Sequence, residues 1–151
     1  MANRANFEKV ETISRIAGAD FRDDGVGEYR FCKVNPNSVT GVGPSNPGKW
    51  YGGAQGQITV DPGNVVLCGA GQNALGVIVG KAALGQPIEV QIGNRALVVC
   101  GGTVTAGDQV ASDANAAAIT QTSTNHILGT ALDSGVAGDL ISITFSPRGE
   151  A

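Results

Sequence analysis

Residues 65–76, VVLCGAGQNALG, decide the fold class of this chain. The pattern Gly-x-Gly-x-x-Ala follows an apolar run, and Glu89 lies about twenty residues further on, as in dinucleotide-binding α/β folds. Such a site needs a helix directly after the glycine turn, because the pyrophosphate binds at the helix N-terminus. The residues that follow, QNALGVIVGKAALG, are interrupted by Gly76 and Gly80 and rich in β-branched side chains, which disfavour a helix. The stretch therefore predicts two strands joined by a glycine turn.

The overlapping stretch GVIVGKA, residues 76–82, is similar to a nucleotide-binding phosphate loop. It is one residue short between the glycines, and Ala82 occupies the position of the hydroxyl residue that binds magnesium. We therefore expect neither a dinucleotide nor a nucleoside triphosphate to bind.

Beyond Gly56 the chain consists of short apolar runs separated by turn residues. Alternation of apolar and polar residues is strictest at residues 88–92, IEVQI, and 141–145, ISITF, which is typical of half-buried strands. The predicted strands are QITV, NVVLC, GVIV, PIEVQI, ALVVC, QVAS, AAIT, HILGTAL and LISITF. Such spacing predicts an all-β fold.

Two further local features lie in this region. The pattern AGDQV at residues 106–110 recurs as AGDLI at residues 137–141. In each copy the glycine can adopt a positive φ angle and the aspartate can accept a hydrogen bond in its own turn. We therefore interpret Asp108 and Asp139 as turn residues before two equivalent strands, not as a catalytic carboxylate pair. Residues 81–84, KAAL, are expected to form a single helical turn.

The N-terminal part differs in composition. Residues 1–50 hold seven Lys or Arg and six Asp or Glu, whereas the longer remainder holds only three and seven. The spacing of Phe7, Val10, Ile13 and Ala17 predicts a short helix, and a partly ordered, charged terminus is the alternative. Residues 28–34, EYRFCKV, alternate as in a strand, and residues 35–56 are dense in Pro, Gly, Asn and Ser, which predicts a loop without a packed element.

These differences predict two parts: a long extended N-terminal arm, residues 1–50, and a β-rich domain, residues 51–151, that folds without most of the arm. Trp50 and Tyr51 lie side by side in the loop, where they either fill the core of the domain or anchor a partner. We take them, with Phe7 and Tyr29, as candidate partner contacts. An extended arm can wrap a neighbouring subunit while remaining soluble beforehand.

Charge and hydropathy exclude several partners. The net charge of −3 at pH 7 provides no basic field for nucleic acid or an anionic membrane. No apolar run is long enough to cross a membrane, and the N-terminal residues lack a signal-peptide core, so we expect the chain to be cytoplasmic at synthesis. The low charge of residues 51–151 favours association with further copies of the chain.

The titratable residues predict no catalytic or metal site. Cys32, Cys68 and Cys100 are far apart and form no Cys-x-x-Cys motif, so we expect three buried thiols instead of disulfides or zinc ligands. Cys68 and Cys100 end apolar runs, which favours burial over nucleophilic catalysis, and His126 is the only histidine. We expect no enzyme activity, cofactor, metal or small-molecule substrate.

From Gly76 onward several short motifs follow one another in a familiar order. They are Gly-Val, Ala-x-Gly-x-Pro before an alternating strand, AGDQV followed by SDA, Gly-x-Ala-Leu, and a final AGD before the last strand. In this series the chain resembles the capsid cement, or decoration, proteins of tailed bacteriophages. It departs from their pattern at residues 113–115, after which a glycine often follows, and in residues 1–50, which the resemblance does not cover.

The resemblance implies a β-barrel or β-tulip domain that forms homotrimers on the outer surface of an icosahedral head. It further implies that the protein binds the major capsid protein at three-fold positions, stabilises the shell and has no catalytic residues. A β-barrel or β-clip carrier domain is the alternative, although no lysine lies at a suitable hairpin tip. A dinucleotide-binding enzyme is the third class. The mass in solution separates them, because the cement interpretation requires a trimer.

Overall fold

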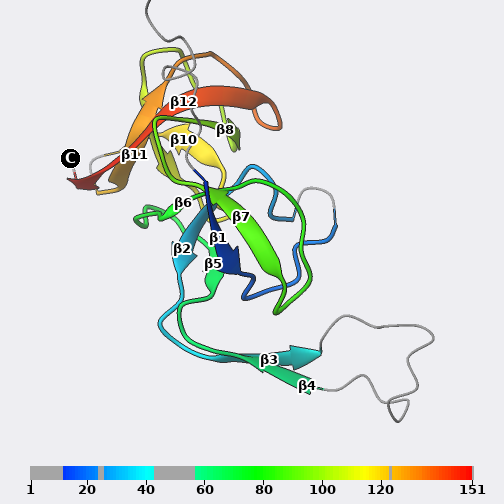
Figure 1. The fold of residues 1–151 in the computed structure, drawn as a ribbon. Coiled ribbons are helices and arrows are strands. Elements are labelled where there is room, and N and C mark those ends of the chain that lie inside the picture. The colour runs from blue at the N-terminus through cyan, green and yellow to red at the C-terminus, as the bar shows by residue number, and fades with distance from the viewer. Residues whose placement is uncertain (1–11, 24–25, 43–56, 123, 151) are drawn as a thin grey trace, which may run out of the picture.

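The computed structural model describes residues 12–23, 26–42, 57–122 and 124–150. The regular secondary structure in these ranges consists of β-strands alone, so the predicted all-β fold is confirmed (Figure 1). The strands are β1 (Thr12–Ile16), β2 (Phe31–Val34), β3 (Val39–Val42), β4 (Gln57–Val60), β5 (Val65–Leu67), β6 (Gly76–Ile78), β7 (Pro87–Gln91), β8 (Arg95–Val99), β9 (Gln109–Ser112), β10 (Ala118–Thr120), β11 (His126–Ala131) and β12 (Leu140–Glu150). Within these ranges no helix is long and apolar enough to cross a membrane.

The nine strands that the sequence predicts after Gly56 are all present, as β4 to β12. The alternating exposure of β7 and β8 explains their periodicity, because every second side chain enters the core. Only β12 is clearly longer than expected, since it continues to Glu150.

Five strands form the first sheet, in the order β1-β7-β6-β2-β5. Its two edge strands meet at a parallel bridge between Ala17 and Val65. The Gly18 N–H donates to the Val65 carbonyl there at 2.8 Å. The sheet therefore curls into a small barrel, which we call the first barrel and which leaves little free edge.

The second sheet repeats this arrangement with the order β10-β9-β11-β12-β8. Its edge strands meet at a parallel bridge between Cys100 and Ala118, and the Gly101 N–H donates to the Ala118 carbonyl at 2.8 Å. This sheet forms the second barrel. Figure 1 shows the two barrels stacked end to end, with the hairpin of β3 and β4 projecting beyond the first barrel.

The two barrels share a core. The larger cluster of buried apolar side chains combines residues of the second barrel with Phe31, Cys68 and Val77 from the first. Phe31 is fully buried, and its ring centroid lies 6.5 Å from that of Phe145 on β12. Because one core draws side chains from both sheets, the barrels pack as a single body.

The helix predicted around residues 7–17 is wrong for the part that the structure describes. Residues 12–16 form β1, which pairs antiparallel with β7 and places Ile13 opposite Val90. Thr12 and the two isoleucines favour a strand, and the long-range partner overrides a weak helical spacing. Residues 7–11 lie outside the described ranges.

Three other local predictions also need correction. The predicted loop at residues 35–56 contains β3, whose pairing with β4 lies far beyond the reach of local patterns. The strand predicted at residues 28–34 begins only at Phe31, because Tyr29 adopts a φ angle of 61° in a turn. Residues 81–84 contain no helix, and their alanines are buried between strands.

The residues assigned to the arm contribute to the first barrel. β2 lies between β6 and β5, and its Phe31 and Cys32 are fully buried, as is Ala17. A chain beginning near Gly52 would lose both β1 and β2, so we no longer expect such a chain to fold. The compositional boundary at residue 50 reflects charge, not the limit of the folded body.

Candidate functional site

The three cysteines are free and buried, as the sequence predicted. Burial raises the pKa of the Cys32 thiol to about 12, with a further contribution from Cys68, and burial also raises the pKa of Cys68 to about 12. The pKa of Cys100 is raised by burial and then by the charge of Asp139. Since the thiolate is the reactive form, none of these thiols is activated. The described residues also hold no group of three His, Cys, Asp or Glu suited to a metal ion.

The glycine turn that resembles a dinucleotide motif joins β5 to β6 and is tied to the second barrel. Gly71 donates its N–H to the Ser112 carbonyl at 2.8 Å and accepts the His126 backbone N–H at 3.1 Å. The Nδ1 atom of His126 lies 3.0 Å from the same carbonyl. The turn leads into a strand, so the strand-turn-strand interpretation is confirmed and no helix N-terminus faces the turn. His126 has a structural contact here.

Asp108 and Asp139 occupy equivalent turns. Each Oδ2 atom accepts the backbone N–H of the residue three positions earlier, at 3.0 Å in both turns. The preceding glycines have φ angles of 95° and 92°, which side chains rarely tolerate. The two turns lead directly into β9 and β12. The repeat is therefore a structural device, as the sequence predicted.

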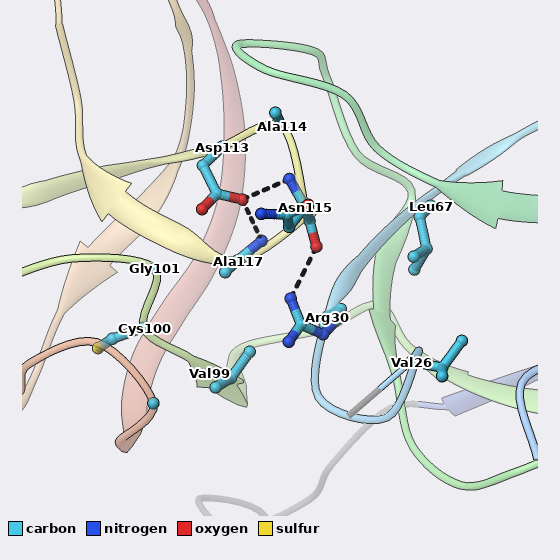
Figure 2. Close-up of a pocket in the computed structure, with 11 residues that line it drawn as sticks. Val26, Arg30, Leu67, Val99, Cys100, Gly101, Asp113, Ala114, Asn115 and Ala117 are labelled. Carbon is cyan, nitrogen blue, oxygen red and sulfur yellow. Dashed lines mark hydrogen bonds between the residues drawn. The ribbon is translucent and has the colours of Figure 1, made fainter. Parts of the chain in front are cut away.

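A pocket of about 380 Å³ lies at the seam between the barrels (Figure 2). Nη1 of Arg30 donates to the Asn115 carbonyl at 2.8 Å. Oδ1 of Asp113 accepts the N–H groups of Asn115 and Ala117 at 2.8 and 2.9 Å. These bonds hold the turn between β9 and β10 against the first barrel, so the polar side chains that line the pocket act on the protein's own backbone.

The same turn explains one departure from the resembling proteins. Ala116 has a φ angle of 63°, in the left-handed region that favours glycine. Its side chain is fully buried, and its carbonyl accepts the Phe31 N–H at 2.9 Å. An alanine therefore occupies a position whose backbone geometry suits the glycine found in the related pattern.

Of the four candidate contact residues, only Tyr29 belongs to the described ranges. Phe7, Trp50 and Tyr51 lie outside them. Tyr29 is half-buried and lies at the seam, where its N–H donates to Ile78 at 2.8 Å and its carbonyl accepts the Val99 N–H at 2.9 Å. Its backbone thus links the two barrels. Nothing in the structure tests its side chain as a partner contact.

A second cavity, of about 620 Å³, lies between the hairpin and the first barrel. It is lined by β1, by β4 and by the turn at residues 61–64. Arg15 lines this cavity, and its Nη2 atom donates to the Gly63 carbonyl. The guanidinium group of Arg15 therefore binds the turn of the protein itself.

An apolar patch lies on the outer face of the second barrel. Leu97, Leu132 and Leu140 are 43%, 45% and 51% exposed. The register between β12 and β8 places Leu97 opposite Ser142. Leu132 follows β11, the other neighbour of β12, and its N–H donates to the Ser142 carbonyl at 2.8 Å. Leu140 lies two residues from Ser142, on the same face of β12. We call these three leucines with Ser142 the outer-face patch.

The sequence analysis did not single out these residues. Part of the signal was present, because alternation through residues 140–145 puts Leu140 on the same side as Ser142. Leu97 and Leu132 join them only through pairing between β8, β12 and the end of β11. A contiguous exposed apolar surface of this kind commonly marks an interaction site.

The model of the phage cement protein family matches residues 54–145, which is more than half of the chain. The chain belongs to this family, so the resemblance found in the sequence is confirmed. The family is one of structural proteins of the bacteriophage capsid and is not an enzyme class. No curated protein sequence matches it.

Among solved structures, the chain is similar to the crystal structure of the N base of the head fiber gp8.5 of bacteriophage phi29. The TM-score is 0.60, the sequence identity is 15%, and the match covers 95% of this chain and 98% of the other. At such low identity the likeness concerns the fold. It extends over both barrels, including the N-terminal strands that the family model does not reach.

Proposed function

We propose that this protein is a capsid cement protein that forms a homotrimer, binds the major capsid protein on the outer surface of the phage head and stabilises the shell. The observation that carries the proposal is the family match to residues 54–145. The likeness to the base of a phage head fiber supports a place on the head surface. The chain would be made in the bacterial cytoplasm and join the head there.

The physical properties of the body suit this role. Its thiols are protonated and buried, its turn carboxylates accept backbone hydrogen bonds, and its two barrels share one core. Such a body suits a structural role, because it is rigid and its polar side chains bind its own backbone. Many identical weak contacts on one particle then add through avidity, so no single site has to bind tightly.

The N-terminal fifty residues carry the contact with the capsid in this proposal. They hold most of the cationic residues, and the aromatic candidates Phe7, Tyr29, Trp50 and Tyr51 lie in or beside them. Aromatic side chains are the usual anchors of protein interfaces. The hairpin of β3 and β4 projects from the first barrel on the side opposite the second barrel (Figure 1). In the sequence, Trp50 and Tyr51 lie between these two strands.

Co-sedimentation with undecorated heads tests capsid binding. The full chain should sediment with the heads and raise the temperature at which they release their genome. Trp50→Ala with Tyr51→Ala should weaken binding while leaving the melting temperature of the free protein unchanged. Val136→Ser, which alters an exposed apolar residue outside the N-terminal fifty residues, is the matched control. A lower melting temperature with normal binding would show that the aromatics fill the core. Failure of the full chain to sediment would refute the proposed function.

Light scattering tests the oligomeric state. The expected mass is three times that of the 15.2 kDa chain. A concentration-independent mass near 15.2 kDa would reject the homotrimer and favour a carrier domain.

A further inference from the structure

We propose that the outer-face patch is the surface through which copies of this chain contact one another, so that its occupant is a second copy. The inference rests on the proposed function, because it identifies the subunit contact of the proposed homotrimer. It assigns self-association to the second barrel and leaves the first barrel and its hairpin for the capsid.

The first argument is the shape of the surface. Neighbouring strands lie about 5 Å apart, so Leu97 and Leu132 stand about 10 Å apart with the small Ser142 between them. Leu140 adds a third apolar side chain one step along β12, opposite the half-buried Val99. The backbone that carries the leucines is hydrogen-bonded to neighbouring strands, so the backbone needs no ordering when a partner arrives.

The second argument is the distribution of charge between the barrels. The strands β8 to β12 and the turns between them contain only two Lys or Arg residues, Arg95 and Arg148. The first barrel, in contrast, carries cations of several strands and turns, among them Arg15, Arg22, Arg30 and Lys33. Permanent contacts between subunits are poor in charge and resemble a divided core, whereas contacts that form later are more polar. The outer-face patch has the composition of the permanent kind.

The third argument identifies a second copy as the occupant. Charges of both signs lie at opposite ends of the patch. Arg95 pairs with Thr144, about 13 Å along β12 from Leu140, while Asp133 and Asp139 lie at the Leu140 end. Among the described residues only Arg22 and Asp20 form an ion pair, so within this part of the chain Arg95 and these two aspartates have no ionic partner. In a ring with three-fold symmetry each copy meets the next head to tail, so the aspartates of one copy face Arg95 of its neighbour, and such pairs set orientation.

The test replaces two leucines in the full chain. Leu97→Ser with Leu140→Ser removes most of the exposed apolar surface but no buried side chain. Each exposed leucine that becomes buried contributes about tenfold to association, so the concentration at half dissociation should rise about a hundredfold. Light scattering and sedimentation equilibrium measure it, and circular dichroism confirms folding. Val34→Ser is the matched control, because Val34 is 44% exposed on the first barrel and should leave the mass unchanged.

A second variant decides the matter if the double variant does not fold. Arg95→Glu retains every leucine and alters only an exposed side chain, but it opposes the partner's aspartates. It should weaken association at least tenfold. A folded double variant with wild-type mass, or an Arg95→Glu variant with wild-type association, would overturn the inference.

Head binding separates this inference from the proposed function. If the double variant is monomeric and the wild-type protein binds heads as a trimer, both stand. If the double variant remains trimeric yet no longer sediments with heads, the patch faces the capsid and the second-copy assignment is wrong. If the wild-type protein does not bind heads at all, the proposed function fails, whatever the variants do to the mass.

Discussion

Gly129 offers the sharpest test of the second barrel. It lies in β11 at a register shift against β12, and a Cβ atom placed on it would lie 1.7 Å from the Thr144 carbonyl oxygen. Cβ atoms essentially never approach a heavy atom within 3.0 Å, so Gly129→Ala requires a backbone shift of at least 3.0 − 1.7 = 1.3 Å. The obstacle is backbone in a paired strand, which cannot rotate away as a side chain can.

The cost should therefore reach the upper end of overpacking in cores, about 3 kcal/mol. For a domain of this size such a loss lowers the melting temperature by about 6–12 °C. Circular dichroism during heating, at one fixed protein concentration, measures the change. Gly102→Ala is the matched control, because its Cβ would meet only Ile119, at an ordinary 3.8 Å. If Gly129→Ala melted within 2 °C of the control, the close approach of β11 and β12 would be refuted.

Three further predictions concern the turns, the thiols and the glycine motif. Asp139→Ala removes the acceptor of the Val136 N–H and should lower the free energy of unfolding, measured in urea, by about 1 kcal/mol. Asp61 is exposed, so the control Asp61→Ala should have less than half that effect, and equal effects would contradict the capping role of Asp139. Folding raises the pKa of the Cys32 thiol from 9.0 to about 12, so the contribution of this thiol to the free energy of unfolding should be complete below pH 9 and decline as the pH rises toward 12. The urea midpoint of unfolding should therefore be lower at pH 11 than at pH 7. Equal midpoints, or a decline that Cys32→Ala does not reduce, would oppose this prediction. Millimolar NAD or ATP should leave the melting temperature unchanged, since the glycine turn leads into β6; a rise of several degrees would demonstrate binding to the native state.

The strands after Gly56 could be predicted because their signal is local. Alternation in residues 88–92 and 141–145 is imposed by a sheet with one buried face, and every second residue must be apolar whatever the partner strand is. The turns before β9 and β12 were also predictable, because Gly and Asp act on their own backbone there. The burial of Cys68 and Cys100 followed from their positions at the ends of apolar runs.

The N-terminal strands could not be predicted in the same way. Residues 12–16 suit a helix or a strand about equally, and the choice is made by β7, more than seventy residues further along the chain. β3 is likewise defined by its pairing with β4 across residues that lie outside the described ranges. The charge of residues 1–50 suggested a separate arm, but Phe31 and Cys32 within it are core residues.

By itself, the sequence determined the all-β class, the nine strands after Gly56, the structural character of the turns and thiols, and a resemblance that the family match confirms. Those features depend on neighbouring residues, whose periodicity and turn chemistry are written along the chain. Only the tertiary structure decided that two sheets close into barrels through Ala17–Val65 and Cys100–Ala118, and that Leu97, Leu132 and Leu140 form one surface. Register between distant strands determines which side chains become neighbours, and it is selected by the packing of the whole core, which no local window of sequence contains.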